Sequence, residues 1–401
     1  MNLKRLLPIY LGAMLTPMGG VGILTLLPVI ARDWAISIQW MTLAVTIYMV
    51  PFVVFQLFSG PIAVIFDTRK TLLFGFGMYA LGGFLSAWAP NLELMVGFRF
   101  IQGFGAAFIA PIIMALIGEM VDPKKMGRSM GIMGVMYTCG VTMGPLISGF
   151  LEVRLGWPWF FLFLAALAST IGIFYGVIHR SSTEAQKGSG KFADAFLLVK
   201  KSYSYADVRF LSFAAFFLFI GFIGLMTFMA EHLKAAYGLP SDKIGLILST
   251  TGFLGMLVAP FAGILGDRLG RKRVAYLGAA FMVLALLALT FLDYRYERYL
   301  LVFALYGSGA AACWTSLNTL AVQMIPELRK PVASVYNCVK FSGYAVAPVI
   351  LSFRIRRGSC HSVSFFWILF HRGRPLGLSR GNSDQHGPHF PDSKRPGLMA
   401  S

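Results

Sequence analysis

The segment GILGDRLGRKR, residues 263–273, concentrates charge and glycine between two long apolar stretches. A carboxylate such as Asp267, held near a helix N-terminus or an arginine, gains charge-assisted hydrogen bonds that must break when the helices separate. The segment therefore predicts a latch that stabilises one of two conformations. Alternatively, it is a basic loop that only sets membrane topology. The candidate gating residues are Gly263, Asp267, Arg268, Gly270, Arg271 and Lys272.

A second copy of this segment reads GPIAVIFDTRK at residues 60–70, at an offset of 203 positions. Val64 stands where the other copy has Asp267, and Asp67 stands where it has Gly270. Asp67 and Arg69 are further candidate gating residues, but we expect the backbone at Asp67 to differ from that at a glycine. The two copies therefore predict a gate that is asymmetric between the halves of the chain.

The stretch RFIQG, residues 99–103, places an arginine about four residues inside a long apolar stretch. A charged side chain in hydrocarbon costs about 3 kcal/mol or more unless it reaches water, a partner or the interface. Arg99 either snorkels to the outer headgroups or faces a cavity, with Gln102 one turn away on the same face and Gly103 allowing close helix packing. In the cavity-facing arrangement, Arg99 and Gln102 predict a hydrogen-bond network that senses or relays a proton.

Small residues and prolines recur in two apolar stretches with the same offset of 203. Glycines let another helix pack closely, and proline removes a backbone donor and bends or loosens a helix. The pattern predicts a pliable seam that limits leakage, or close packing alone. The candidate helix-bend residues are Gly140, Gly144, Pro145 and Gly149, with Gly343 and Pro348 as counterparts.

Further polar and aromatic candidates lie in the second half of the chain. The first apolar stretch contains no acidic residue that could carry a proton, so other ionisable residues must be considered for proton coupling. Glu231 and Lys340 are the secondary candidates. Four phenylalanines within residues 213–219 either line a pocket for apolar substrates or face lipid.

Membrane-spanning helices are needed to position these residues. Of the 401 residues, 57% are hydrophobic and 13% are charged, which leaves far more apolar surface than a soluble globule can bury. Each long apolar stretch must be a helix, because hydrocarbon offers no partner for backbone polar groups. The sequence predicts an all-α polytopic membrane protein with eleven spans, at about residues 6–31, 40–62, 71–89, 95–118, 130–151, 158–178, 210–231, 244–265, 274–292, 300–321 and 332–352.

The spans fall into two halves of the same orientation, since six spans separate the matching residues. Parallel repeats of this kind are typical of a transporter architecture that holds its substrate between the halves. We predict two parallel six-helix bundle repeats, of which the second lacks its last helix. The predicted units are an N-terminal bundle at 1–178, a cytoplasmic linker at 179–209, a C-terminal bundle of five spans at 210–352 and a polar, basic tail at 353–401.

Basic residues set the predicted orientation. With the N-terminus in the cytoplasm, nineteen Lys and Arg lie on the inner side and six in outer loops, as the positive-inside rule requires. The formal net charge of +18 is therefore mainly topological, and no nucleic acid partner is expected. We expect a multi-pass protein of the plasma membrane.

Three segments resemble signatures of the major facilitator superfamily, and they occur in the expected order. GILGDRLGRKR is similar to its loop motif, RFIQGFGAA at 99–107 to its fourth-span motif, and GVTMGPLISG at 140–149 to a fifth-span motif of exporters that exchange drugs or metabolites for protons. The resemblance covers about residues 1–352. It implies the two-bundle fold, a gating role for the charged loop and a cavity-facing Arg99.

The composition changes abruptly after Ser352. Residues 353–401 contain eight Lys or Arg and four of the six His, and their longest apolar run, SVSFFWILF, is too short to span a bilayer. By the repeat, a twelfth helix is due near residue 355, and a basic tail after eleven spans would lie outside, against the positive-inside rule. Our hypothesis is a reading-frame shift near residue 352, which would make the product inactive, with a disordered tail. The alternative is an unusual native C-terminus.

The sequence predicts a secondary active transporter that exports drug-like or small metabolite substrates in exchange for protons by alternating access. One alternative is a nutrient symporter or facilitator, against which the segment GVTMGPLISG argues. Another is a receptor or scaffold, for which we expect a large soluble domain that this sequence does not contain. An enzyme is not expected, since no catalytic side chains cluster at span ends. The expected partners are a small-molecule substrate, protons and the lipid bilayer, with no cofactor, no metal and a monomeric chain.

Overall fold

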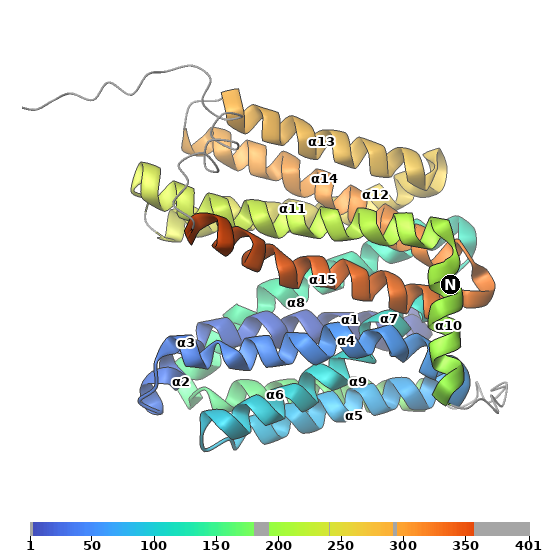
Figure 1. Ribbon diagram of the computed structural model, residues 1–401, viewed down its shortest axis with the longest axis horizontal. Helices are drawn as coiled ribbons and strands as arrows, with labels where there is room; N and C mark the ends of the chain where they lie inside the picture. The colour runs from blue at the N-terminus through green and yellow to red at the C-terminus, as the bar shows by residue number, and fades with distance from the viewer. Residues whose placement is uncertain (1–2, 180–191, 240, 292–294, 357–401) are drawn as a thin grey trace, which may run out of the picture.

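The computed structural model describes residues 3–179, 192–239, 241–291 and 295–356, and these are almost entirely helical (Figure 1). The all-α prediction is confirmed. The first half contains α1 (Leu3–Gly22), η1 (Ile23–Thr25), α2 (Leu27–Asp33), α3 (Ile38–Met41), α4 (Leu43–Phe66), α5 (Thr68–Ala87), α6 (Leu92–Ala107), α7 (Ala110–Met120), η2 (Pro123–Lys125), α8 (Met126–Leu155) and α9 (Pro158–Ile178). The linker and second half contain α10 (Phe192–Ser204), α11 (Ala206–Tyr237), α12 (Ser241–Leu269), α13 (Arg271–Phe291), α14 (Tyr296–Gln323), η3 (Pro326–Leu328) and α15 (Arg329–Arg356).

Nine helical segments within the described residues are long and apolar enough to cross a membrane, and each coincides with a predicted span. The other two predicted spans, 71–89 and 332–352, are formed by α5 and α15. The helix α5 carries Arg69 and Lys70 in its first turn, and α15 carries Lys340 near its middle. All eleven predicted spans are therefore helices of the structure.

The helices form two groups that lie side by side (Figure 1). One group contains α1 to α9 and the other α11 to α15, and α10 runs across one end, where it packs against α4, α11 and α15. The groups converge at the end that carries α10 and spread apart toward the opposite end. The predicted linker thus contains a helix, while its residues 180–191 lie outside the described part of the chain.

Matched helix contacts indicate that the two halves share one packing plan. Gly103 of α6 lies against the backbone carbonyl of Tyr48 in α4, and Gly307 of α14 lies against that of Thr251 in α12. A Cβ at either glycine would overlap the facing carbonyl oxygen, so glycine is needed for this close approach. The two contacts are related by offsets of 203 and 204 positions, as the predicted parallel repeat requires.

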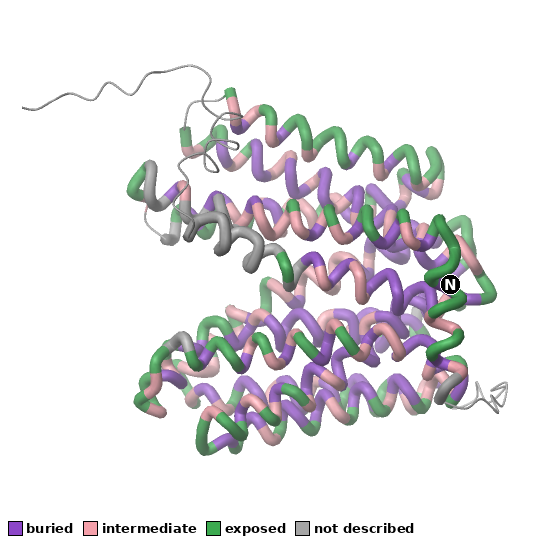
Figure 2. The backbone as a smooth tube through the Cα atoms, viewed as in Figure 1, coloured by how far each residue is buried: buried purple, intermediate pink, exposed green. Residues whose placement is uncertain are grey.

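The apolar core follows the same division. One cluster of buried residues fills the first half around Phe76 and Phe161 and reaches Tyr336 of α15, and another lies in the second half around Phe303. Figure 2 shows the exposed residues mainly along the outer faces of the helices. Apolar side chains on those faces are the ones that hydrocarbon solvates in a membrane protein.

The halves differ in how their outer helices are covered. In the first half α9 packs against α5, and ten residues of α5 are buried. The repeat-related helix α13 buries four residues and exposes Tyr276 and Phe291. The offset of 203 relates α9 to residues 361–381, which lie outside the described part of the chain, so the missing last helix of the second bundle stays a prediction. Residues 353–356 of the predicted tail continue α15, and 357–401 lie outside the described residues.

Candidate transport cavity and gate

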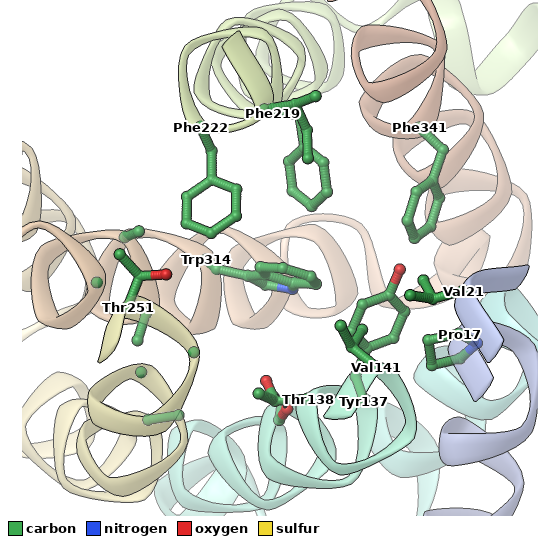
Figure 3. Close-up of a pocket in the computed structure, with 18 of the residues that line it drawn as sticks. Pro17, Val21, Tyr137, Thr138, Val141, Phe219, Phe222, Thr251, Trp314 and Phe341 are labelled. Carbon is green, nitrogen blue, oxygen red and sulfur yellow. Dashed lines mark hydrogen bonds between the residues drawn. The ribbon is translucent and has the colours of Figure 1, made fainter. Parts of the chain in front are cut away.

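A cavity of about 200 Å³ lies between the two halves (Figure 3). Its walls come from α1, α4 and α8 on one side and from α11, α12, α14 and α15 on the other. Apolar side chains dominate the lining, with hydroxyl groups from residues such as Thr138 and Thr251, and none of the described lining residues is acidic or basic. Such a site suits an apolar molecule with few polar groups.

Aromatic side chains from both halves meet in this cavity. The ring centroid of Tyr137 in α8 lies 5.1 Å from that of Trp314 in α14 and 6.1 Å from that of Phe341 in α15. Phe219 of α11 lies 4.7 Å from Trp314 and 5.7 Å from Phe341. Figure 3 shows these rings projecting into the cavity from different helices. Their spacing is that of edge-to-face and offset aromatic contacts, so the four rings form one aromatic cluster in the wall of the cavity.

Asp267 links the two halves at the end that carries α10. Its carboxylate accepts hydrogen bonds from the backbone N–H groups of Gly127 at 2.8 Å and Arg128 at 3.1 Å, and Arg271 donates to it at 3.0 Å. The unpaired N–H groups and positive dipole of the α8 N-terminus stabilise this carboxylate. Gly263 lies against the carbonyl of Gly127, where a Cβ would overlap it. Separation of the halves at this end breaks the bonds to Gly127 and Arg128.

Two hydrogen bonds to the carbonyl of Pro123 also join the halves at this end. The carbonyl oxygen of Pro123 accepts hydrogen bonds from Arg271 at 2.8 Å and from Gln323 at 3.3 Å. Arg271 therefore bridges the Asp267 carboxylate and the first half. The other predicted basic gating residues, Arg268 and Lys272, are exposed and lie outside these contacts.

The two copies of the loop segment share a positive φ at matched positions. Gly270 has a φ of 96° and Asp67 a φ of 116°, and the expected difference between the backbone at Asp67 and that at a glycine stays a prediction. An aspartate is held here in a conformation that L residues rarely adopt. Its carboxylate accepts from the backbone N–H of Lys70 at 2.8 Å and caps α5 within the first half. Arg69 donates to the carbonyl of Gly176 in α9 at 2.8 Å, again within the first half.

Different contacts join the halves on the other side of the closed end. Val64, at the position related by the repeat to Asp267, is 42% exposed and has no carboxylate. Instead, the backbone N–H of Gly60 donates to Ser334 Oγ at 2.8 Å. The Lys330 ammonium pairs with the Glu119 carboxylate at 3.1 Å. One side of the closed end is therefore joined through the Asp267 carboxylate, and the other through a serine hydroxyl and a Lys–Glu ion pair.

Arg99 is fully buried within the first half and does not snorkel. Its guanidinium donates to the carbonyls of Ala44 at 3.2 Å and Gly19 at 3.0 Å and to Oε1 of Gln102 at 2.6 Å. The guanidinium carbon lies 4.2 Å from the ring centroid of Tyr48, which lines the cavity. Arg99 and Gln102 share one face as predicted, but Arg99 lies one layer behind the cavity wall and does not face the cavity.

The predicted helix-bend residues mainly pack helices within each half. Gly140 and Gly144 lie against backbone atoms of α1, and Gly343 lies against a backbone carbonyl of α11. The helix α8 continues without interruption through Pro145, and no atom lies within 4 Å of a Cβ built on Gly149. The structure therefore contains the close packing that the pattern predicts.

Lys340 is buried in α15, with 3% of its surface exposed, and its Nζ lies 3.4 Å from Oδ1 of Asn318. Glu231 belongs to α11 and Pro348 to α15, but their side chains lie outside the described residues. Of the secondary candidates, Lys340 is thus the one whose surroundings are described.

The sequence alone identified little of the cavity. Of the phenylalanines at 213–219, Phe219 lines it. Tyr137, Trp314 and Phe341 were missed, because an aromatic residue in an apolar span looks the same whether it faces lipid or a cavity. The signal that could have located them is their position beside the matched glycines of the repeat.

The sequence model of the Major Facilitator Superfamily matches residues 9–348. Multidrug resistance protein Stp of Mycobacterium tuberculosis is 23% identical, over 77% of this chain and 67% of its own length. Riboflavin transporter RibZ of Clostridioides difficile is 23% identical, over 76% and 77%. The bacillibactin exporter of Bacillus subtilis is 24% identical, over 92% and 96%.

Solved structures have the same fold. The human organic anion transporter MFSD10 matches with a TM-score of 0.74 and 17% identity, over 92% of this chain and 98% of that one. The proton:xylose symporter XylE matches with a TM-score of 0.70 and 16% identity, over 92% and 90%. Given a family match across most of the chain, paired helix groups and a central cavity, this protein belongs to the major facilitator superfamily and is a secondary transporter of the membrane.

Proposed function

We propose that this protein exports small aromatic molecules across the plasma membrane by alternating access, in exchange for protons. The proposal depends chiefly on the apolar cavity between two repeat-related halves, which is closed at one end by hydrogen bonds between those halves. These hydrogen bonds exist only in the conformation that is closed at this end, so their free energy favours that conformation. The closed end is rich in Lys and Arg and is therefore assigned to the cytoplasm. In this orientation the structure is an outward-facing state.

Export is favoured over uptake by two observations. The segment GVTMGPLISG resembles an exporter motif, and it lies on α8, where Val141 lines the cavity. The relatives include a multidrug resistance protein and a bacillibactin exporter. Uptake of a nutrient remains the alternative direction, and a transport measurement distinguishes the two.

The test is dye efflux from proteoliposomes that contain the full chain. Liposomes are loaded with anionic, neutral and cationic aromatic dyes, and release is compared with that from protein-free liposomes. Ala311 lines the cavity on α14, so Ala311→Trp should fill it and abolish the protein-dependent release. Leu301→Trp on the exposed face of the same helix should retain release. Equal release by the Ala311→Trp variant and the wild type would contradict transport through this cavity.

Proton exchange is tested in the same vesicles with an imposed pH gradient. We expect an inward proton gradient to accelerate dye export and substrate export to drive proton entry. Arg99 with Gln102, Glu231 and Lys340 are the candidate residues for this coupling. Release at one rate with and without the gradient would indicate a facilitator, and gradient-driven uptake would indicate a symporter.

A further inference from the structure

Lys340 lies behind the cavity wall, and among the described residues no acidic side chain pairs with it. Within that part of the chain its ammonium makes a single hydrogen bond, at 3.4 Å to Oδ1 of Asn318. An ammonium has three donors, and burial without acceptors is costly. Among the described residues, Oδ1 of Asn318 is therefore the one acceptor that the ammonium reaches.

The polar groups around Lys340 include further unused donors. Nδ2 of Asn318 and Oη of Tyr336 are buried and have no hydrogen-bond partner among the described residues. Tyr336 lies one turn before Lys340, and its ring centroid is 4.9 Å from Nζ. An amide NH₂ and a tyrosine hydroxyl both donate hydrogen bonds. A group with several acceptor oxygens would complement all three side chains.

One layer of aromatic rings separates Nζ from the cavity. The ring centroids of Phe341, Trp314 and Phe219 lie 4.6, 5.5 and 5.8 Å from Nζ. All three residues line the cavity (Figure 3). The rings stabilise the ammonium through cation–π interactions. Rotation of one of these side chains would bring Nζ into contact with a molecule in the cavity.

Arg99 shows how this protein satisfies a buried cation that needs no outside partner. Its guanidinium donates to two backbone carbonyls and to Gln102, all within the first half. Among the described residues, Lys340 makes one long hydrogen bond, and the donors beside it, Nδ2 of Asn318 and Oη of Tyr336, have no partner. Of these two buried cations, Lys340 is therefore the one suited to an acceptor from outside the protein.

We propose that Lys340, together with Asn318, binds the negative charge of the substrate, and that the substrates are aromatic organic anions such as aromatic carboxylates. This inference rests on the proposed transport function and specifies its substrate class. The carboxylate accepts hydrogen bonds from Nζ of Lys340 and Nδ2 of Asn318, while the ring of the substrate packs among the aromatic side chains. An aromatic cation meets a like charge at the same place and binds weakly.

The test measures binding to the full chain in nanodiscs by calorimetry, with naphthoate, naphthamide and naphthylmethylammonium as probes. Naphthoate and naphthamide have nearly the same shape, so their affinity ratio reports charge recognition. A charge-assisted hydrogen bond contributes more binding free energy than a neutral one. The wild type should therefore bind naphthoate about 10- to 100-fold more tightly than naphthamide. The ammonium probe should bind least tightly. In Lys340→Met the ratio should fall to about one, with naphthamide affinity retained.

Three further variants make the result decisive. Lys340→Arg should retain the preference for naphthoate, Asn318→Leu should reduce it in part, and Lys200→Met, which removes an exposed lysine, should leave it unchanged. If Lys340→Met does not fold, the ratio in Asn318→Leu tests the same site. An unchanged ratio in the folded Lys340→Met or Asn318→Leu protein overturns the proposal, as does a wild type that binds naphthamide or the ammonium probe as tightly as naphthoate.

The two proposals fail in distinguishable ways. If naphthamide binds to the wild type and Ala311→Trp removes that binding, the cavity is a substrate site even when the preference for naphthoate is absent. If none of the probes binds to the wild type, charge recognition by Lys340 is refuted together with the aromatic substrate site.

Discussion

Substitution of Asp267 by asparagine should shift the balance between the two conformations of the protein. The carboxylate is 9% exposed and accepts two backbone N–H groups of the opposite half, from Gly127 and Arg128. A hydrogen bond to a charged group contributes about 1.5–3 kcal/mol and a neutral one about 0.5–1.5 kcal/mol. Loss of the charge at both bonds therefore weakens the closed end by about 2 kcal/mol. This corresponds to a shift of roughly 30-fold toward the inward-open state.

The assay is the distance between spin labels at Lys70 and Arg273, measured by double electron–electron resonance in nanodiscs. These residues are exposed, are related by the repeat and lie in opposite halves near the closed end. The wild type should give mainly the short distance, and Asp267→Asn should add a longer one. Asp67→Asn is the matched control, because Asp67 caps a helix within its own half. An unchanged distribution in Asp267→Asn, or an equal shift in Asp67→Asn, would refute the latch.

Three further predictions concern the free energy of unfolding in detergent. At Asp67 the positive φ should make the glycine variant about 1–3 kcal/mol more stable than the alanine variant; equal values would contradict backbone strain. Arg99→Met should lose about 2 kcal/mol or more, because three buried acceptors lose their donor, and wild-type stability would refute that role. Gly103→Ala should lower the free energy of unfolding by about 1–3 kcal/mol, because its Cβ overlaps α4. Gly149→Ala is the control: the position is in open space, so the change should be neutral or slightly stabilising. Similar values for the two variants would contradict close packing at Gly103.

Hydropathy and the internal repeat predicted the architecture. A span of about 20 apolar residues leaves the backbone no alternative to a helix in hydrocarbon, so even α5 and α15, with charged residues inside them, were located. The offset of 203 also identified Asp267 as the acidic residue of one loop copy and Val64 as its replacement in the other. These features follow from the chain itself, because they depend on residue type and spacing.

The direction of side chains within the spans could not be predicted in the same way. A membrane helix is apolar on most of its surface, so periodicity does not show which face meets a cavity. Arg99 was therefore expected at the cavity, but the ring of Tyr48 lies between the Arg99 guanidinium and the cavity. The partners of Asp267 were missed for another reason: they are backbone N–H groups, and every residue except proline has one.

The most direct test of alternating access measures both ends of one protein. The Lys70–Arg273 pair reports the closed end, and labels at Arg154 and Arg298, both exposed, report the opposite end. The account predicts that Asp267→Asn lengthens the first distance and shortens the second, since the halves rock around the cavity between them. Distances that both stay unchanged, or that both lengthen, would contradict it.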